Sequence, residues 1–470
     1  MIKFGTGGWR AVIADGFTKA NVQRLVAGLC DMMKAEGVAG QGLLIGYDRR
    51  FLSREAAEWA AEVAAGAGVP AAILPREAPT PLVMFGVREY GFPYGMMVTA
   101  SHNPAIYNGV KVFVSGGRDA SQAVTDKLQG YIAALHGDIP CMPFAEAAGK
   151  GLCREMDPFN DYIDSILALV DTEAIRKARL KVVLDPMYGV SQTSLRTILM
   201  TARCDVTVIH ERHDTLFGGR LPAPNVDTLG SLAAAVQEQK ADIGLATDGD
   251  ADRIGVIDDN GRFVHPNKLL VILYYYLLCY RGWRGPAVRN TSTTHLLDRV
   301  AMGFGQACHE VPVGFKHISA KMEETNALIG GESSGGLTVR GHIGGKDGIY
   351  AAALLCEMTA VTGKPISALY QEITARFGEV YAADADIGMT EEKKAELQAL
   401  LLPEKALPEF TEEVARISYQ DGCKAYFKNG GWVICRFSGT EPLLRICAEG
   451  PSQEKAGEYV ETWRTFLAGR

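Results

Sequence analysis

The feature that most constrains the fold of this chain is its alternation of short apolar runs with amphipathic helical stretches. Leu43–Tyr47 has the length and composition of a buried strand, and Ser53–Ala67 has helical spacing. Ser53, at the start of that stretch, is expected to be the N-cap residue. Ala71–Leu74 and Tyr94–Val98 continue the pattern as strands. This alternation predicts α/β layers.

The same alternation recurs further along the chain. The strands expected there are residues 180–184, 206–210, 241–246 and 254–257, and the helices expected next are residues 266–280 and 317–325. The last section differs: it predicts a helix over residues 391–401 and an antiparallel pair around the turn at residues 428–431. No shared sequence period shows that the α/β units are repeats.

The chain of 470 residues is too long for a single core. We expect an α/β fold of four domains, three of them similar α/β units with mixed sheets and the last a smaller α+β unit. The expected domains are residues 1–155, 156–258, 259–368 and 369–470. No low-complexity linker separates them, which predicts close packing.

Composition excludes several classes of function. The formal net charge is −7, so we expect no nucleic-acid partner, and local basic groups must meet any anionic substrate. The ten cysteines form no C-x-x-C pair, which favours reduced thiols over disulfides or a zinc site. The start of the chain has no apolar signal segment, and the longest apolar run, Leu269–Cys279, is too short for a membrane span. We therefore expect a cytoplasmic protein without a membrane partner.

An acidic run directly follows the expected strand at residues 241–246. In an extended loop Asp248, Asp250 and Asp252 share one face and can converge on a cation. Three carboxylates without histidine or cysteine favour Mg²⁺. A calcium EF-hand is disfavoured, because Arg253 and Asp259 occupy the positions of its glycine and glutamate. The alternative is a solvated acidic turn.

Ser101 is the candidate nucleophile. It follows the expected strand Tyr94–Val98, at the kind of strand exit where α/β sheets place ligands. A serine hydroxyl needs a base or a metal to activate it, and His102 and Lys111 are nearby in sequence. The alternative is a loop serine that caps a helix.

Two further loops have the composition of ligand sites. In Gly330–Gly336 the glycines allow close backbone approach, and Glu332 and Ser334 offer hydrogen bonds to sugar hydroxyls. Arg436–Pro442 combines a guanidinium, hydroxyls and glycine into an anion cradle, although it lacks the ending of a Walker loop. A flexible turn and a strand-to-helix turn are the respective alternatives. Two isolated cations, Arg10 and Lys316, also lie in glycine-containing loops, where either could be a surface charge.

In the order and type of these motifs the chain resembles the α-D-phosphohexomutases, the phosphoglucomutase/phosphomannomutase family. The resemblance extends from Phe4–Arg10 to Arg436–Pro442, and the serine loop together with the D-G-D-A-D-R run is its most specific part. Two positions depart from the family. Gly336 stands where relatives that act on mannose or glucosamine often have histidine, and Ala11 stands where many have glycine.

The resemblance implies four domains around a central cleft, with the fourth able to rotate. Ser101 would be the phosphoserine and would hold Mg²⁺ together with Asp248, Asp250 and Asp252. The other implied roles are Arg10 and Arg253 beside the phosphoserine, Lys111 and His102 in proton transfer, Glu332 and Ser334 on sugar hydroxyls, Lys316 over the sugar, and Arg436, Ser438, Gly439 and Thr440 on the phosphate that does not react.

The reaction expected from these parts interconverts hexose 1-phosphate and hexose 6-phosphate through a hexose 1,6-bisphosphate. The cofactors would be Mg²⁺ and glucose 1,6-bisphosphate as activator, and the partner a small phosphosugar bound by a monomer or dimer. The Gly336 loop favours glucose; a phosphomannomutase and a dual-specificity enzyme are the alternatives. A metal-dependent sugar phosphatase and a non-enzymatic phosphosugar-binding protein are rivals from other classes.

Overall fold

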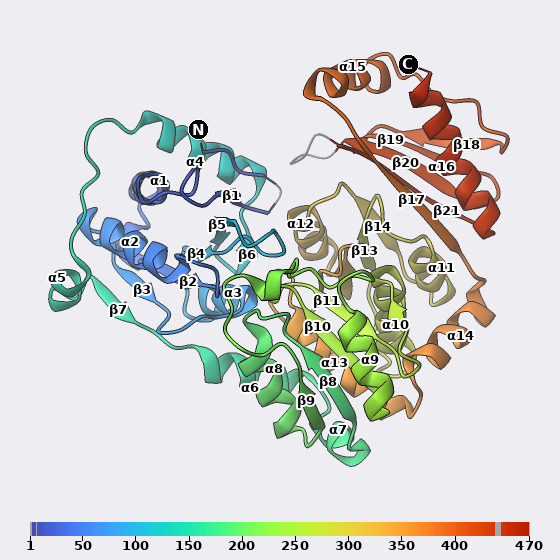
Figure 1. Ribbon diagram of the computed structural model, residues 1–470, viewed down its shortest axis with the longest axis horizontal. Coiled ribbons are helices and arrows are strands. Elements are labelled where there is room, and N and C mark those ends of the chain that lie inside the picture. The colour runs from blue at the N-terminus through green and yellow to red at the C-terminus, as the bar shows by residue number, and fades with distance from the viewer. Residues whose placement is uncertain (1, 6, 438–442, 470) are drawn as a thin grey trace.

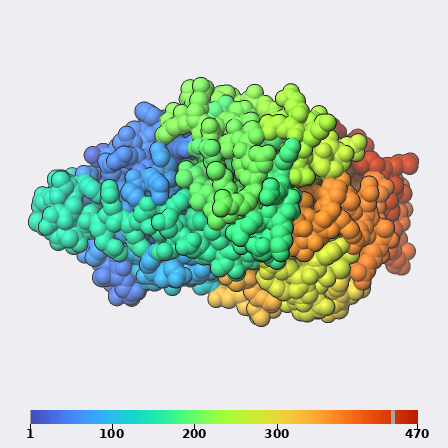
Figure 2. All heavy atoms as spheres, turned by 90° about the horizontal axis from the view of Figure 1, so that it is seen from below, coloured from blue at the N-terminus to red at the C-terminus, as the bar shows by residue number. Residues whose placement is uncertain are grey.

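The computed structural model describes residues 2–5, 7–437 and 443–469. Over these residues the chain forms four units in sequence order, each built on its own sheet (Figure 1). The molecule is elongated, with the first unit at one end and the fourth at the other (Figure 2). The predicted fold class, three α/β units with mixed sheets and a smaller last unit, is confirmed.

The first unit has a seven-stranded mixed sheet. Along the sheet the strands are β1 (Trp9–Val12), β5 (Tyr107–Val114), β4 (Tyr94–Val98), β2 (Leu43–Tyr47), β3 (Ala71–Ile73) and β7 (Cys153–Glu155), with β6 (Arg118–Asp119) paired to β5. Its helices are α1 (Lys19–Ala35), α2 (Ser53–Gly66), α3 (Thr80–Glu89), α4 (Gln122–Ala134) and α5 (Phe144–Gly149). β2 runs parallel to β3 and β4, whereas β5 is antiparallel to β4. The loop between β4 and β5 therefore lies at one end of the sheet.

The second unit has a five-stranded sheet. Its strand order is β12 (Phe263–Val264), β11 (Ile254–Ile257), β10 (Ile243–Thr247), β8 (Lys181–Asp185) and β9 (Asp205–Val208). Its helices are α6 (Phe159–Leu169), α7 (Thr172–Ala178), α8 (Ser191–Thr201) and α9 (Gly230–Gln239). β8 is parallel to both neighbours, and β10 and β11 form an antiparallel pair. Residues 248–253 make the connection between β10 and β11.

The third unit has a four-stranded sheet. Its strand order is β14 (Cys308–Val311), β13 (Ala287–Asn290), β15 (Ile329–Gly331) and β16 (Leu337–Val339). Its helices are α10 (Pro266–Cys279), α11 (Leu296–Gly303), α12 (Phe315–Thr325), α13 (Gly348–Thr362) and α14 (Ile366–Phe377).

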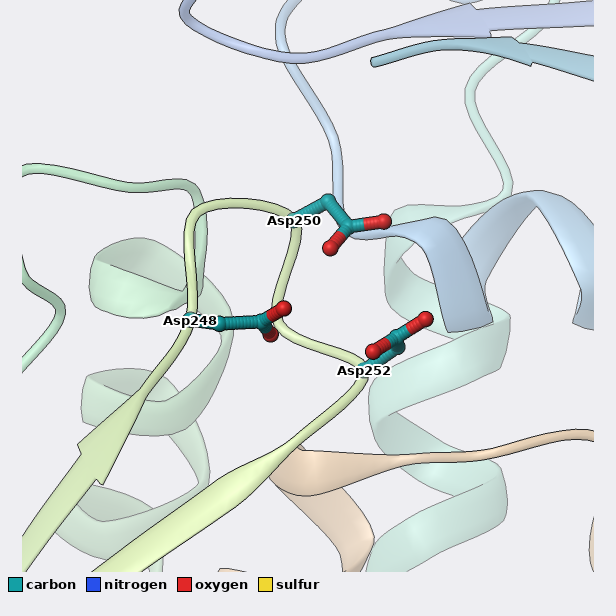
Figure 3. A group of neighbouring side chains, drawn as sticks. All are labelled: Asp248, Asp250 and Asp252. Carbon is teal, nitrogen blue, oxygen red and sulfur yellow. The ribbon is translucent and has the colours of Figure 1, made fainter. Parts of the chain in front are cut away.

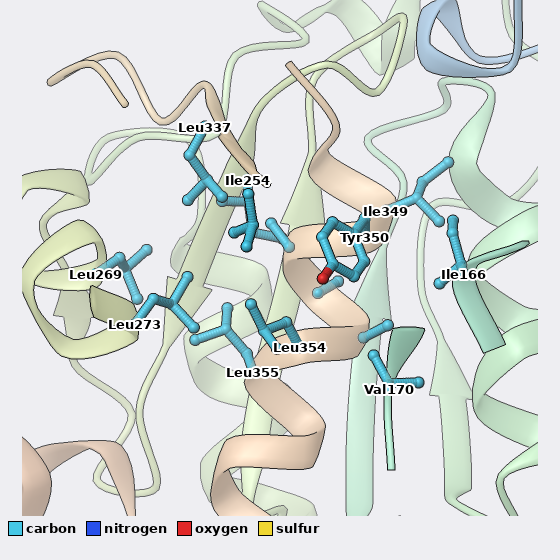
Figure 4. Packing of buried hydrophobic residues seen from close by; sticks show 14 of the residues in the cluster. Ile166, Val170, Ile254, Leu269, Leu273, Leu337, Ile349, Tyr350, Leu354 and Leu355 are labelled. Atoms are coloured by element: carbon cyan, nitrogen blue, oxygen red, sulfur yellow. The ribbon is translucent and has the colours of Figure 1, made fainter. Parts of the chain in front are cut away.

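Helix α13 joins the cores of the second and third units. It is apolar on nearly every side and buried from Gly348 to Thr359, as a helix enclosed by protein must be. It contacts α7 and α8 of the second unit as well as α10 of the third. Figure 4 shows Ile349, Tyr350, Leu354 and Leu355 of this helix among side chains from both units. The two units are therefore held by one continuous core.

The fourth unit has a wholly antiparallel sheet with a core of its own. Its strand order is β17 (Tyr381–Gly388), β21 (Leu443–Gly450), β20 (Trp432–Phe437), β19 (Cys423–Phe427) and β18 (Val414–Ser418), and its helices are α15 (Glu391–Leu401) and α16 (Gln453–Ala468). The predicted helix at residues 391–401 and the predicted antiparallel pair around residues 428–431 are confirmed. No helix within the described ranges has the length and apolar character needed to cross a membrane.

Three details differ from the sequence prediction. Ser53 is not the N-cap of α2: Leu52 holds that position, and the Ser53 hydroxyl donates to Asp48 Oδ1 at 2.8 Å instead. β12 pairs with β11, so the second sheet extends past the boundary expected at residue 258. Helix α14 spans the boundary expected at residue 368 and contacts α10 and α11 of the third unit.

Candidate active site

The loop that carries Ser101 leaves the first sheet at the end of β4 and returns to it as β5. Ser101 is buried and has a left-handed backbone conformation with φ 53°. Its backbone N–H donates to Thr99 Oγ1 at 2.8 Å. A non-glycine residue adopts this conformation at a cost, so the surrounding contacts must hold the loop in place.

Arg50, which the sequence analysis did not single out, supplies those contacts. Its guanidinium donates to four backbone carbonyl oxygens around the loop. These acceptors are Ser101 at 2.7 Å, Asn103 at 2.7 Å, Pro104 at 2.9 Å and Tyr107 at 3.0 Å. The buried Asp48 carboxylate lies 3.4 Å from Arg50 Nε and accepts from Thr99 Oγ1 at 2.6 Å. Asp48 and Arg50 together fix the position of the candidate nucleophile.

The three acidic residues converge in the loop between β10 and β11 (Figure 3). Each offers one carboxylate oxygen, and these oxygens lie within 4.8 Å of one another. Asp248 Oδ2 accepts from Ser101 Oγ at 2.8 Å, so the serine hydroxyl and the acidic group are in direct contact. Gly249 makes this approach possible, since a Cβ there would lie 2.7 Å from the carbonyl oxygen of Ser101.

The acidic group has the donor set of a divalent-cation site. Asp250 Oδ1 and Asp252 Oδ1 are buried and have no hydrogen-bond partner. A buried carboxylate oxygen without a partner is costly, and a cation is the natural counterpart for carboxylates that each place one oxygen within 4.8 Å of the others. Oxygen ligands alone suit Mg²⁺ or another hard ion. The residues present therefore fit the predicted metal.

Two lysines hold the other side of these carboxylates. Lys111 Nζ lies 2.6 Å from both Asp250 Oδ2 and Asp252 Oδ2, and Lys346 Nζ lies 2.8 Å from Asp252 Oδ2. Burial lowers the pKa of Lys111, but Asp250 and Asp252 outweigh it and the net shift is upward. Burial and the two other carboxylates raise the pKa of Asp248 to about 8. A divalent cation would favour the ionised form of all three acids.

Positive charge gathers on the remaining side of Ser101. Arg10 Nη1 donates to Asn103 Oδ1 at 2.6 Å, and His102 Nδ1 lies 3.3 Å from Ser101 Oγ. The backbone N–H of Arg253 donates to Asp248 Oδ1 at 3.0 Å, and its Nε is buried without a hydrogen-bond partner. The charge of Arg253, with burial and Arg10, lowers the pKa of His102 well below its usual range. This potential suits a phosphoryl group on the serine.

The glycine-rich loop begins at β15 and ends at β16. Glu332 Oε1 accepts from Gly314 N–H at 3.0 Å and from Asn290 Nδ2 at 3.2 Å, while Ser334 is exposed. A Cβ at Gly336 would lie 2.3 Å from Cδ of Lys346. The absence of a side chain at position 336 therefore makes room for the lysine that reaches the acidic group.

The other predicted residues lie in the third and fourth units. Lys316, in α12, donates to Gln122 Oε1 of the first unit at 2.7 Å, and burial lowers its pKa. Arg436, in β20, donates from Nε to Asp421 Oδ1 at 3.1 Å. The predicted residues Ser438, Gly439 and Thr440 lie outside the described part of the chain.

The structure thus brings one predicted group together. Arg10, His102, Lys111 and Arg253 surround Ser101 and the acidic residues. The sequence analysis did not predict four residues of the site: Asp48, Arg50, Thr80 and Lys346. The Thr80 hydroxyl donates to Asp250 Oδ2 at 2.5 Å. A polar run directly after the strand Leu43–Tyr47 was a usable signal for Asp48 and Arg50, whereas no local pattern marks Lys346.

Comparison with known proteins identifies the family of this chain. Four family models match successive stretches: the phosphoglucomutase/phosphomannomutase alpha/beta/alpha domains I, II and III at residues 1–136, 160–261 and 265–377, and the C-terminal domain at residues 388–465. The chain belongs to the phosphoglucomutase/phosphomannomutase family. The resemblance inferred from the motifs is confirmed, and so is the prediction of an isomerase of the mutase type.

Relatives within the family carry different names. A phosphoglucomutase/phosphomannomutase of Thermococcus kodakarensis is 30% identical over 466 residues, which cover 97% of this chain and 96% of that protein. A phosphoglucosamine/phosphogalactosamine mutase of Sulfurisphaera tokodaii is 28% identical over 398 residues, 84% of each chain. The open form of pp63/parafusin, a phosphoglucomutase from Paramecium, has a TM-score of 0.84 at 20% identity and covers 100% of this chain and 97% of its own. Proteins of this family are thus named for different hexose phosphates.

Proposed function

We propose that this protein interconverts hexose 1-phosphate and hexose 6-phosphate, with glucose as the preferred sugar, through a phosphoserine at position 101. The observation that carries the proposal is the contact of Ser101 Oγ with Asp248, 2.8 Å away, in a group of three carboxylates. A hydroxyl beside a cation site and under positive charge from Arg10 and Arg253 has the parts that phosphoryl transfer needs.

The chemistry takes place in two transfers. In the first, the bond from phosphorus to Ser101 Oγ breaks as a bond forms to O6 of a hexose 1-phosphate. The proton of the 6-hydroxyl ends on Ser101 Oγ, and His102, whose Nδ1 lies 3.3 Å from that oxygen, is the group placed to carry it. The bisphosphate then turns, its 1-phosphoryl group returns to Ser101 Oγ, and O1 takes up the proton. The product is hexose 6-phosphate, and each step runs equally in reverse.

Asp248, Asp250 and Asp252 would hold Mg²⁺, which supplies Lewis-acid stabilisation of charge on the phosphoryl oxygens. Arg50 and Asp48 keep the serine loop in its strained conformation, so the nucleophile needs little reorganisation. Lys111 balances the charge of two carboxylates. Arg436 in the fourth unit would bind the phosphate that does not react.

The preference for glucose rests on the Gly336 loop. A side chain at this position would meet the stem of Lys346, whose Nζ lies 2.8 Å from Asp252 Oδ2. Relatives named for glucosamine show that the family takes other sugars, and one hydroxyl contact can decide between them. Mannose 1-phosphate and glucosamine 1-phosphate are therefore the competitors to test.

The experiment is a coupled assay with Mg²⁺ and a trace of glucose 1,6-bisphosphate on the three hexose 1-phosphates. The proposal expects the largest kcat/KM for glucose. Comparable values for glucose and mannose would make the protein a dual-specificity mutase, and a large advantage for glucosamine would overturn the sugar assignment. Activity on none of them, with release of inorganic phosphate, would favour the metal-dependent phosphatase.

A further inference from the structure

Asp421 lies where the fourth unit meets the third. It precedes β19 by two residues, next to Arg436 near the end of β20. Both side chains are mostly buried, with 19% of Asp421 and 17% of Arg436 exposed. Its neighbour Gly422 has φ +88°, and a Cβ there would lie 2.5 Å from the carbonyl oxygen of Cys435. The turn is therefore built to bring the Asp421 carboxylate against Arg436.

The two oxygens of this carboxylate serve different units. Oδ1 accepts from Arg436 Nε at 3.1 Å, within the fourth unit. Oδ2 accepts from the backbone N–H of Val313 at 2.7 Å and from Thr291 Oγ1 at 3.1 Å, both in the third unit. Only a carboxylate can accept on both sides, since an amide at this place would point N–H groups at one of the donors.

The contact with the third unit leads to the glycine-rich loop at residues 330–336. Val313 is followed by Gly314, whose backbone N–H donates to Glu332 Oε1 at 3.0 Å. A single carboxylate thus connects the arginine of the proposed phosphate cradle to the segment that positions the glutamate of the proposed sugar contact.

We propose that Asp421 is a positioning residue that orients the Arg436 guanidinium for the non-reacting phosphate and sets this guanidinium in register with the glycine-rich loop at residues 330–336. The inference rests on the proposed function and goes beyond it. Nε donates to Asp421, and the described residues give the two terminal nitrogens of Arg436 no hydrogen-bond partner. These nitrogens can form a fork toward a phosphate, the geometry in which arginine binds anions best. Asp421 touches no reacting atom.

This role predicts where a defect would appear. The non-reacting phosphate is held in both transfers and while the bisphosphate turns, so a misplaced Arg436 weakens the grip on the intermediate. Loss of the intermediate leaves the serine unphosphorylated, and turnover then depends on bisphosphate added from outside. A residue that serves only the fold would lower stability without this dependence.

The test compares Asp421→Asn with two matched variants. Glu413→Gln removes an exposed ion pair with Lys428 in the same unit, and Thr291→Val removes one bond to Asp421 Oδ2 but leaves Arg436 bound. Calorimetry measures glucose 1,6-bisphosphate binding in the presence of Mg²⁺, and the coupled assay measures KM, kcat and the concentration of added bisphosphate that gives half activity.

The proposal expects Asp421→Asn to bind the bisphosphate about tenfold more weakly, because a charge-assisted bond is lost. KM and the half-activating bisphosphate concentration should rise by a similar factor, with a smaller change in kcat. Glu413→Gln should stay within about twofold of wild type. In a double-mutant cycle Asp421→Asn should add little to Arg436→Lys. If Asp421→Asn fails to fold, Asp421→Ser replaces it.

Three outcomes would overturn the proposal: binding by Asp421→Asn as tight as wild type, an equal defect in Thr291→Val, or full additivity with Arg436→Lys. The first would leave Asp421 with no part in the cradle, the second would make it a contact between units only, and the third would uncouple it from Arg436. A wild-type protein that neither binds the bisphosphate nor turns over hexose phosphate would instead refute the proposed function.

Discussion

Two clusters of charged residues lie at junctions between units, and they differ in whether every buried polar atom has a hydrogen-bond partner. The reactive cluster, at the junction of the first and second units, consists of Ser101, Lys111, Asp248, Asp250 and Asp252. The junction cluster, between the third and fourth units, consists of Arg289, His295, Asp298, Glu310 and Lys424. Both place carboxylates beside a buried lysine or arginine.

In the junction cluster every charge has its partner. Glu310 Oε2 lies 2.6 Å from Arg289 Nη1 and 2.7 Å from Lys424 Nζ, and Lys424 also donates to the carbonyl oxygen of Thr291 at 2.6 Å. Within the described ranges, none of its side chains has a buried polar atom without a hydrogen bond, whereas the reactive cluster leaves Asp250 Oδ1 and Asp252 Oδ1 bare. A cluster whose buried polar atoms are all hydrogen-bonded stabilises one structure. Buried carboxylate oxygens without partners indicate a ligand site.

The largest effect should come from Ser101→Ala. The variant keeps every charged residue of both clusters and removes only the nucleophile. We therefore expect the fold to remain and kcat to fall about a hundredfold or more, about 3 kcal/mol in activation free energy. The coupled assay and circular dichroism measure the two properties. More than about a hundredth of wild-type activity would contradict the role of Ser101.

Asp252→Asn tests whether Asp250 Oδ1 and Asp252 Oδ1, which have no hydrogen-bond partner, hold a metal. In wild type, Mg²⁺ should raise Tm because it binds only the folded state. The variant should lose most of that increase and about tenfold or more in kcat/KM. Thermal unfolding at a series of Mg²⁺ concentrations gives the comparison. An undiminished Mg²⁺ response in Asp252→Asn would show that the cation binds elsewhere.

Glu310→Gln breaks the satisfied cluster instead. It removes the carboxylate that Arg289 and Lys424 share. Arg289 keeps Asp298, but the buried Lys424 is left without a carboxylate, so the free energy of unfolding should fall by about 3 kcal/mol. Denaturant unfolding followed by tryptophan fluorescence reports this, with the exposed pair of Glu413 and Lys428 as control, where Glu413→Gln should cost less than about 1 kcal/mol. The stabilisation by Mg²⁺ should persist in Glu310→Gln. Its loss would mean that the two clusters are not independent.

The smallest effect is a pH dependence of the junction cluster. Burial and the charge of Arg289 lower the pKa of His295 to about 3 from its usual 6.5. Between these values the unfolded chain binds a proton that the folded chain does not, so stability falls as pH drops below about 6.5, by at most about 1.4 kcal/mol per pH unit. Glu310, whose pKa lies well below its usual 4.5 in the folded protein, adds to this loss only below about pH 5, where the unfolded carboxyl takes up its proton.

His295→Gln should reduce the fall in the free energy of unfolding between pH 7 and pH 5.5 by roughly 1 kcal/mol. Lys424, which lies 3.1 Å from His295 Nε2, stays charged there in both proteins, because its pKa of about 8 lies above the window. Curves that run parallel for variant and wild type would assign the acid sensitivity to other groups.

The sequence predicted what depends on local pattern. Hydrophobic spacing placed the strand Ile254–Ile257 and the helix Glu391–Leu401 at their observed bounds. The alternation of acidic residues predicted their convergence, because neighbouring residues in one loop share geometry. Ser53 was misplaced as a cap because its hydroxyl finds Asp48, five residues earlier, a better partner than the helix end.

Contacts between distant segments could not be predicted in this way. Lys346 reaches Asp252 only because the second and third units share the core around α13 and position 336 carries no side chain. Asp421 meets Val313 only through the packing of the fourth unit. The location of the protein, its oligomeric state and the roles of the site residues remain predictions.

The most direct measurement of the central claim is the site of phosphorylation. Wild-type protein incubated with glucose 1,6-bisphosphate and Mg²⁺ is digested and its peptides are examined by mass spectrometry. The account predicts one phosphoryl group, on Ser101, and, when that group is isotopically labelled, transfer of the label to the 6-phosphate of the product once glucose 1-phosphate is added in excess. Phosphorylation at another residue, or none in a protein that turns over the sugar, would contradict it.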